Sequence, residues 1–167
     1  ENPLFADKNV RRALSLALDR EEMAKAITFA KAATGFLPDT VIDTATGKTF
    51  RKDTLLGTGA DLTAARAALA AAEIPAGVAR AFTLTVQDDA ENRALAALAK
   101  AAWEELGFTV TVKYAQPVTH KVYDVSTGAE VTITDSGMQT LIKEASVGKR
   151  DFDVIGLDWQ MYSRDAM

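Results

Sequence analysis

The fold is decided by two stretches, FTLTVQ at residues 82–87 and FTVTVKY at residues 108–114. In both, apolar side chains alternate with mostly polar ones, which is the period of a strand with one buried face. Between them, residues 90–106 carry apolar side chains at helical spacing and follow Asp89, a residue type that favours helix starts. Two strands joined by such a helix are expected to lie parallel, with a right-handed crossover. The sequence therefore predicts an α/β fold.

A third apolar run lies in the stretch DFDVIGLDWQMYSRD at residues 151–165. Val154, Ile155 and Leu157 fit a strand buried in a sheet that helices cover. In open α/β sheets, ligands bind outside the carboxyl ends of the strands. We therefore expect the ligand-binding residues just after this run, at Asp158, Trp159, Gln160, Met161, Tyr162 and Asp165. The alternative is that Trp159 covers the sheet edge and the acids are solvated.

Four more helices are predicted from apolar residues that recur three and four positions apart. They cover residues 10–18, 20–29, 62–73 and 138–147. Asp19 and Asp61 stand where helix caps are expected. With the helix at 90–106, they are expected to pack on a small mixed sheet, burying Trp103, Leu98 and Ile142 among other side chains.

Two hairpins are predicted outside this core. Val41–Phe50 turns at Gly47, and Lys121–Thr134 turns at the run Ser126-Thr127-Gly128. The second hairpin falls in residues 117–137, which have the character of an insertion.

Composition excludes several classes of function. The 167 residues are 48% apolar and 25% charged, as in ordinary soluble domains, and the net charge of −4 provides no basic surface for nucleic acid. There is no cysteine, which removes disulfides, thiolate metal sites and a cysteine nucleophile. No apolar stretch is long enough to cross a bilayer, and the first residues do not form a signal peptide. We expect the chain to be a fragment of a longer protein.

Few residues suggest catalysis, a metal or a cofactor. The run Gly57-Thr58-Gly59 lacks the remaining residues of a phosphate-binding or dinucleotide-binding loop. Asp88 and Asp89 could serve acid–base chemistry or a hard metal, but helix capping accounts for adjacent acids at this turn. His120, the only histidine, is interpreted as a polar surface residue. Asp158 with Asp165 remains the one pair that a small α/β enzyme could use.

The sequence resembles a known family in five places. They are residues 5–20 (FADKNVRRALSLALDR), the GFLP turn at 35–38, AARAAL at 64–69, EELGFTV at 104–110, and the acidic DFD at 151–153 that leads to Asp158-Trp159. Together they resemble the peptide/nickel class, family 5, of the extracellular solute-binding proteins of ABC transporters. The resemblance spans nearly the whole chain.

This resemblance implies a lobe of the periplasmic-binding-protein-like fold, class II or cluster C. Residues 1–167 would form most of the second, C-terminal lobe, and the first lobe would be missing. The implied function is binding of a peptide or similar small solute between two lobes and delivery to an ABC permease, without catalysis or cofactor. It also implies an extracytoplasmic location, either as a cell-surface lipoprotein or in a periplasm, with any membrane anchor outside these residues. A non-transport interaction module with the same fold is the remaining alternative.

One position departs from the family pattern. In peptide-binding members, an aspartate three residues after this tryptophan pairs with the α-ammonium group of the ligand. Counting from Trp159 gives Tyr162, which is uncharged at neutral pH. Either Asp158 or Asp165 takes over that role, or the free amino terminus is not recognised in this way. We favour the second interpretation, because Trp159, Met161 and Tyr162 would form a largely apolar wall.

Overall fold

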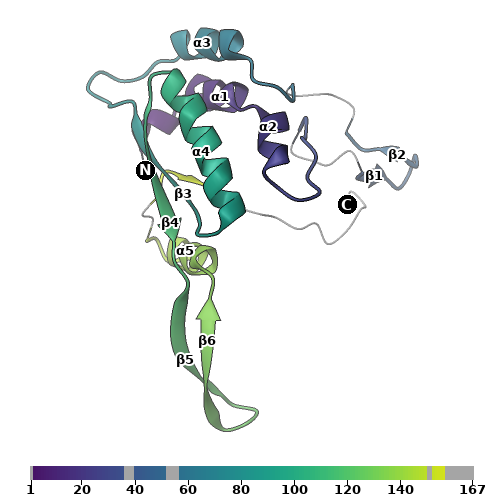
Figure 1. The fold of residues 1–167 in the computed structure, drawn as a ribbon, viewed down its shortest axis with the longest axis vertical. Helices are drawn as coiled ribbons and strands as arrows, with labels where there is room; N and C mark the ends of the chain where they lie inside the picture. Colours follow the sequence, from purple (N-terminus) through teal and green to yellow (C-terminus); the bar gives the residue numbers. More distant parts are fainter. Residues whose placement is uncertain (1, 36–39, 52–56, 150–151, 157–167) are drawn as a thin grey trace.

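The structure, a computed structural model, describes residues 2–35, 40–51, 57–149 and 152–156. Its centre is a three-stranded parallel sheet (Figure 1) in the order β4 (Thr109–Ala115), β3 (Ala81–Gln87) and β7 (Val154–Ile155). β3 pairs with β4 along its whole length, and Leu84 of β3 lies opposite Val154 of β7. The predicted parallel strand–helix–strand unit is therefore confirmed.

The helix α4 (Ala90–Glu105) packs against β3 and β4, and α1 (Lys8–Ala17) contacts α4 and contributes to the same hydrophobic core. α3 (Leu62–Ala70) lies on α1, and α2 (Arg20–Lys25) follows α1 at a corner. A short 3₁₀ turn, η1 (Pro3–Phe5), precedes α1. The core is centred on the ring of Phe82, with Phe5 and Trp103 each 5.3 Å away and Phe108 5.8 Å away between ring centroids. Trp103 is thus a core residue, as predicted.

The corner after α1 has a clear chemical cause. The last four carbonyls of a helix lack intrahelical partners, and three of these in α1 are satisfied from elsewhere. Leu14 accepts from the indole of Trp103, Ser15 from the guanidinium of Arg20, and Leu16 from the backbone N–H of Asp61, each at 2.9 Å. These bonds fix α4, α2 and the start of α3 to one helix end.

Two predicted helices end early. α2 stops at Lys25 instead of Phe29, and Phe29 is fully exposed at a φ of 61°. α2 buries no residue, so packing does not stabilise a further turn. α3 stops at Ala70 instead of Glu73, because the N–H of Glu73 donates instead to the carboxylate of Asp7 at 2.8 Å.

The prediction that Leu98 and Ile142 are buried was wrong. Leu98 is 39% exposed and Ile142 is 45% exposed. On α4, the small side chains of Ala96 and Ala99 occupy the buried face instead. Alanine allows a helix to lie close to its neighbours, whereas a leucine at the edge of that face is displaced toward solvent.

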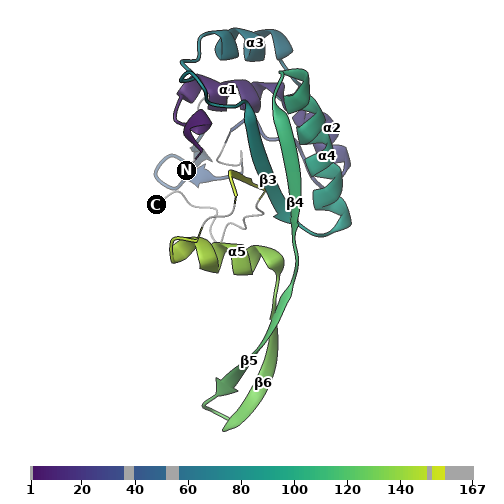
Figure 2. The same cartoon turned by 90° about the vertical axis from the view of Figure 1, so that its left-hand side faces the viewer.

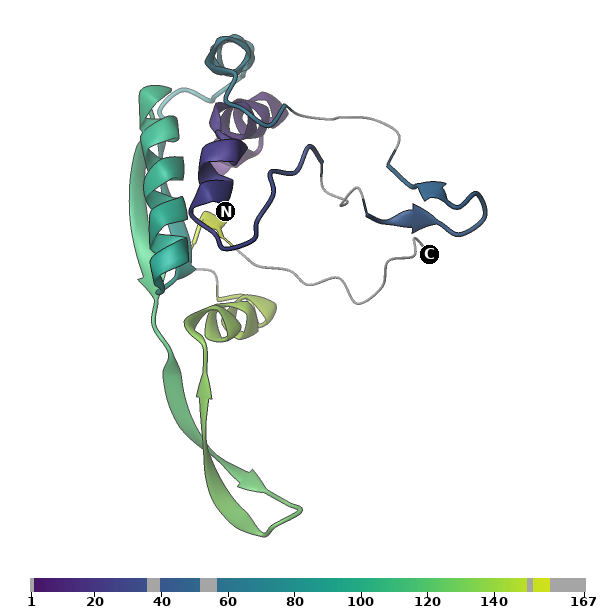
Figure 3. The ribbon, with the colours of Figure 1, turned by 45° about the vertical axis from the view of Figure 1, so that its right-hand side comes forward.

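The remaining elements lie around this core. The hairpin of β1 (Ile42–Asp43) and β2 (Lys48–Thr49) stands away from the sheet in Figure 3. The longer hairpin of β5 (Val118–Asp124) and β6 (Ala129–Asp135) continues the direction of β4 beyond the sheet (Figure 2). α5 (Gly137–Ser146) then crosses the carboxyl end of the sheet, on the side away from α4. Both hairpins were predicted; that residues 117–137 are an insertion stays a prediction.

Candidate functional site

All six predicted ligand-binding residues, Asp158, Trp159, Gln160, Met161, Tyr162 and Asp165, lie outside the described residues. The structure does describe the strand that leads to them. β7 pairs with β3, and beyond it the N–H of Gly156 donates to Thr85 at 3.0 Å. Asp153, just before β7, accepts from the N–H of Thr83 at 2.8 Å. The three parallel strands therefore end at one common edge, which we call the carboxyl edge of the sheet.

Four polar or aromatic side chains meet at this carboxyl edge. Asp88 follows β3, Gln116 follows β4, Tyr114 lies near the end of β4, and Arg93 lies in the first turn of α4. The guanidinium of Arg93 contacts Asp88 Oδ1 through Nε at 2.6 Å and Nη2 at 2.5 Å. Its centre lies 4.3 Å from the centroid of the Tyr114 ring. We call these four residues the edge cluster.

The carboxylate of Asp88 is held on both oxygens. Gln116 Nε2 donates to Oδ2 at 2.5 Å, while Arg93 occupies Oδ1. The Gln116 amide and, after it, the Arg93 guanidinium hold the pKa of Asp88 below its usual range. Asp88 is therefore ionised at neutral pH, and its charge is balanced by that of Arg93.

The neighbouring Asp89 caps a helix and does not belong to the edge cluster. Its carboxylate accepts from the backbone and side-chain nitrogens of Asn92, both at 2.8 Å, and so caps α4. These bonds lower the pKa of Asp89 as well. The prediction of capping is confirmed for Asp89, whereas Asp88 belongs to the edge cluster. Both carboxyl groups therefore favour the ionised form.

The edge cluster can recognise a polar solute. Arg93 is fixed by a carboxylate and an aromatic ring, yet its side chain is 53% exposed. The contacts above use Nε and Nη2, and the Nη1 amino group carries two further N–H donors. An arginine held in this way loses little conformational entropy when it binds a carbonyl or carboxylate. Sequence reasoning missed it, because its partners Asp88 and Tyr114 lie in two other parts of the chain, just after β3 and in β4.

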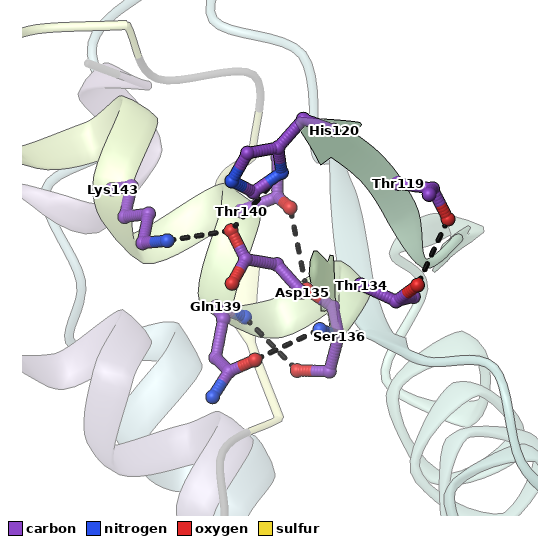
Figure 4. A network of polar contacts seen from close by, with 8 residues as sticks. All are labelled: Thr119, His120, Thr134, Asp135, Ser136, Gln139, Thr140 and Lys143. Carbon is purple, nitrogen blue, oxygen red and sulfur yellow. Dashed lines mark hydrogen bonds and ion pairs between the residues drawn. The ribbon is translucent and has the colours of Figure 1, made fainter. Parts of the chain in front are cut away.

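His120 lies at the base of the β5–β6 hairpin rather than at the carboxyl edge. Figure 4 shows its ring facing Asp135, with Nδ1 3.8 Å from Oδ2. The same carboxylate accepts from Lys143 of α5 at 2.5 Å, and Lys143 is the main cause of its lowered pKa. Ser136 and Gln139 close a capping box beside it. Among the described residues, no group of three or more His, Asp or Glu side chains could hold a metal ion.

An open hollow of about 590 Å³ lies between α2, residues 27–35 and α4. Met23, Ile27 and Leu95 contribute apolar surface, and Arg20 lies at its wall. Burial lowers the pKa of Arg20, and its guanidinium is held by the carbonyls of Ser15 and Leu18. Sequence reasoning placed Met23 and Ile27 on a buried helix face. Met23, within α2, is partly buried against the core and also borders the hollow, whereas Ile27 lies beyond the end of α2 and lines the hollow.

Nowhere in the described part of the chain is a helix long and apolar enough to cross a bilayer.

Comparison with known proteins gives one family. The sequence model of the bacterial extracellular solute-binding proteins, family 5 Middle, matches residues 1–167. A search of curated proteins found no match.

Two solved structures illustrate the likeness. The oligopeptide-binding protein AppA of Bacillus subtilis, solved with a nonapeptide, is 22% identical with a TM-score of 0.50. The alignment covers 68% of this chain and 24% of AppA. The ABC transporter substrate-binding protein CtaP of Listeria monocytogenes is 24% identical with a TM-score of 0.47, over 64% of this chain and 21% of CtaP. The matched part of this chain thus spans about a quarter of the length of these proteins or less.

Proposed function

This chain belongs to the bacterial extracellular solute-binding proteins of family 5, and from this premise we propose that it forms part of the peptide-binding lobe of an ABC importer's binding protein. The carboxyl edge of the sheet, with Arg93 and its partners, would form one wall of the cleft. The other wall would come from a second lobe of the same protein. Peptide is the class of solute we propose, because AppA, which shares this fold, was solved with a nonapeptide.

The family match carries this proposal, because it extends over every residue of the chain. The edge cluster supports it on chemical grounds. A peptide main chain offers a regular series of carbonyl oxygens, and a fixed guanidinium provides matching donors. The Asp88–Arg93 pair is neutral overall, so the wall can be desolvated on closure at less free-energy cost than a lone arginine.

The chain would act by recognition without catalysis. Closing two lobes on a solute excludes water and strengthens each hydrogen bond in the cleft. Delivery to the permease and a location outside the cytoplasm are part of the same proposal, as is any membrane anchor beyond these residues. The segment after β7, with Trp159 and Tyr162, would complete the wall.

The solute's amino terminus is a separate question. Tyr162 stands where peptide-binding members carry an aspartate, so we propose that no carboxylate neutralises a buried α-ammonium here. One peptide in free and N-acetylated forms, titrated into the full-length protein, tests this. We expect affinities within about tenfold, roughly 1.4 kcal/mol. A loss above about a hundredfold on acetylation would establish a buried ammonium pair, and Asp158→Asn and Asp165→Asn would then identify its acid.

The function itself is tested by calorimetric titration of the full-length protein with a peptide mixture. We expect micromolar or tighter binding, and Arg93→Gln should weaken it by about tenfold, roughly 1.4 kcal/mol. Arg66→Gln is the matched control, because Arg66 pairs with Glu105 at 3.2 Å on the outer side of α3 and α4. Absence of peptide binding by the unsubstituted protein contradicts the proposed function. Equal peptide affinities for the two variants would show that Arg93 does not contribute to peptide binding.

A further inference from the structure

The β5–β6 hairpin has two chemically different faces. Residues that pair directly across an antiparallel hairpin lie on the same face. The register pairs Val122 with Val131 and His120 with Ile133. One face, which we call the apolar face, carries Val118, His120, Val122, Val131 and Ile133 in its middle. Two carboxylates bound it: Asp135 at the base, which contacts Lys143, and Asp124 beside Ala129 at the tip, which accepts from Ser126. The opposite, polar face carries Thr119, Lys121, Tyr123, Glu130, Thr132 and Thr134.

The groups of the polar face contact one another. The hydroxyls of Thr119 and Thr134 lie 2.9 Å apart, and Lys121 Nζ lies 3.1 Å from Glu130 Oε2. Such pairs across strands stabilise a face that stays in water. The polar face therefore needs no further partner.

The apolar face is exposed although its chemistry suits burial. Val118 is 44% exposed, Ile133 41% and Val131 36%. A two-stranded hairpin is marginally stable in water, and a contiguous exposed apolar patch usually marks a contact site. Within the described residues, β5 and β6 pair only with each other. The alternation of side chains along the hairpin thus indicates a surface that something else covers.

The hairpin is mounted firmly on the sheet. Asp135, the last residue of β6, contacts Lys143 of α5 and faces His120 of β5 (Figure 4). At the start of α5, Gly137 lies so close to β4 that an added Cβ would be 2.1 Å from the Ala115 carbonyl oxygen. The base of the hairpin is therefore tied to β4 and α5, and its direction follows from theirs.

The β5–β6 hairpin extends from the carboxyl edge of the sheet, where the candidate site lies. β5 begins three residues after β4 ends at the carboxyl edge, and the hairpin projects beyond this edge (Figures 1 and 2). The proposed second lobe would face the same edge. Solved relatives are several times longer than the part that this chain matches, so much of such a protein lies outside these residues.

We propose that the apolar face of the β5–β6 hairpin is an interlobe contact, covered by an apolar, uncharged surface of the other lobe of the same protein. This inference rests on the proposed function in assuming that second lobe. The contact would be present without solute and would hold the two lobes in register beside the cleft. The partner surface must lack charge, because an unpaired charge buried against these valines would be strongly destabilising.

Thiol labelling of the full-length protein, without peptide, tests this contact. The chain contains no cysteine, so Val131→Cys and Thr132→Cys each add one thiol to it, on opposite faces of one strand. We expect Cys at 131 to react with a maleimide at least about tenfold more slowly than Cys at 132. Ile133→Cys gives a second reading of the apolar face. The unsubstituted protein gives the background labelling rate. The rate in denaturant gives the intrinsic reactivity of each thiol, and the native rate at each site is divided by it.

Each result is decisive. Slow labelling at 131 and 133 with fast labelling at 132, independent of protein concentration, supports the interlobe contact. Labelling at 131 and 133 that is less than about tenfold slower than at 132 overturns it, because the face is then open to solvent. Protection that disappears on dilution, with a doubled mass by light scattering, assigns the face to a second copy and also overturns it. Peptide titration judges the proposed function separately, since the labelling uses no peptide.

Discussion

The indole nitrogen of Trp103 donates a hydrogen bond of 2.9 Å to the main-chain carbonyl oxygen of Leu14. That carbonyl belongs to the last turn of α1, where intrahelical partners run out. Trp103 is only 6% exposed, so no solvent replaces the bond if it is lost. One side chain thus fills the core and satisfies a helix end, which fixes α4 against α1.

Replacing the indole by a ring without an N–H donor tests this role. Trp103→Phe keeps an aromatic ring in the core but leaves the Leu14 carbonyl without its donor. We expect a loss of about 1–3 kcal/mol in the free energy of unfolding, from the missing bond and the smaller ring. Urea denaturation measures it, with Ala97→Ser on the exposed side of α4 as control. Equal midpoints for Trp103→Phe and the unsubstituted chain would refute the assigned role.

The sequence predicted those parts of the fold that depend on local patterns. Alternation identified β3 and β4, and the caps Asp19, Asp61 and Asp89 marked three helix starts. Helix ends were harder, because the end of α3 depends on a bond from Glu73 to the distant Asp7. Such a contact has no signature in local sequence.

The candidate site was predicted only in part. The rule that ligands bind at carboxyl strand ends led to the carboxyl edge of the sheet, but the six residues named from it lie outside the described residues and stay a prediction. The edge cluster was missed. In the sequence, Arg93 is an ordinary polar helix residue. Its guanidinium is held in place by Asp88 and Tyr114, and Asp88 is held in turn by Gln116, and only the fold brings these residues together.

A close backbone approach gives a second prediction. An alanine Cβ at position 137 would lie 2.1 Å from the carbonyl oxygen of Ala115, so Gly137→Ala must displace α5 or β4. We expect a destabilisation of about 1–3 kcal/mol, measured by urea denaturation. Gly59→Ala is the control, because nothing lies within 4 Å of its added Cβ. A tolerated Gly137→Ala would mean that α5 is not packed on β4 as described.

Asp7 gives a prediction about pH. Its carboxylate accepts from the N–H of Glu73 at 2.8 Å and from that of Asn9 at 2.5 Å, and these bonds, Glu73 first, lower its pKa. A carboxyl group with a lowered folded-state pKa stabilises the fold above its unfolded pKa of about 3.9. That stabilisation is lost as pH falls through the lower folded-state value.

Asp7→Ala should therefore lower the urea midpoint at pH 7, and the difference from the unsubstituted chain should shrink as the pH falls below about 4. Asp7→Asn keeps an acceptor oxygen without the charge, so its smaller deficit should also depend on pH in this range. Chemical denaturation between pH 3 and pH 7 measures both. A deficit for Asp7→Ala that stays constant over this range would show that ionisation of Asp7 does not stabilise the fold.

The β5–β6 hairpin should be dispensable for folding. Its contacts with the body are confined to its base, so deleting Val122–Thr134 and closing with a short Gly-Ser link should leave one cooperative transition. We expect the thermal midpoint to change by only a few degrees, as for a loss of about 1 kcal/mol. Circular dichroism on heating measures it. A broad or absent transition would place the hairpin in the folding core.

The central claim, that this chain is one wall of a two-lobed peptide cleft, is tested most directly by comparative calorimetry. The full-length protein and the separate chain of residues 1–167 are titrated with the same peptide mixture. One wall alone can neither exclude water nor provide all the polar contacts. We therefore predict micromolar or tighter binding by the full-length protein, and binding at least about a hundredfold weaker, roughly 2.7 kcal/mol, by the separate chain. Equal affinities, or no binding by the full-length protein, would contradict the claim.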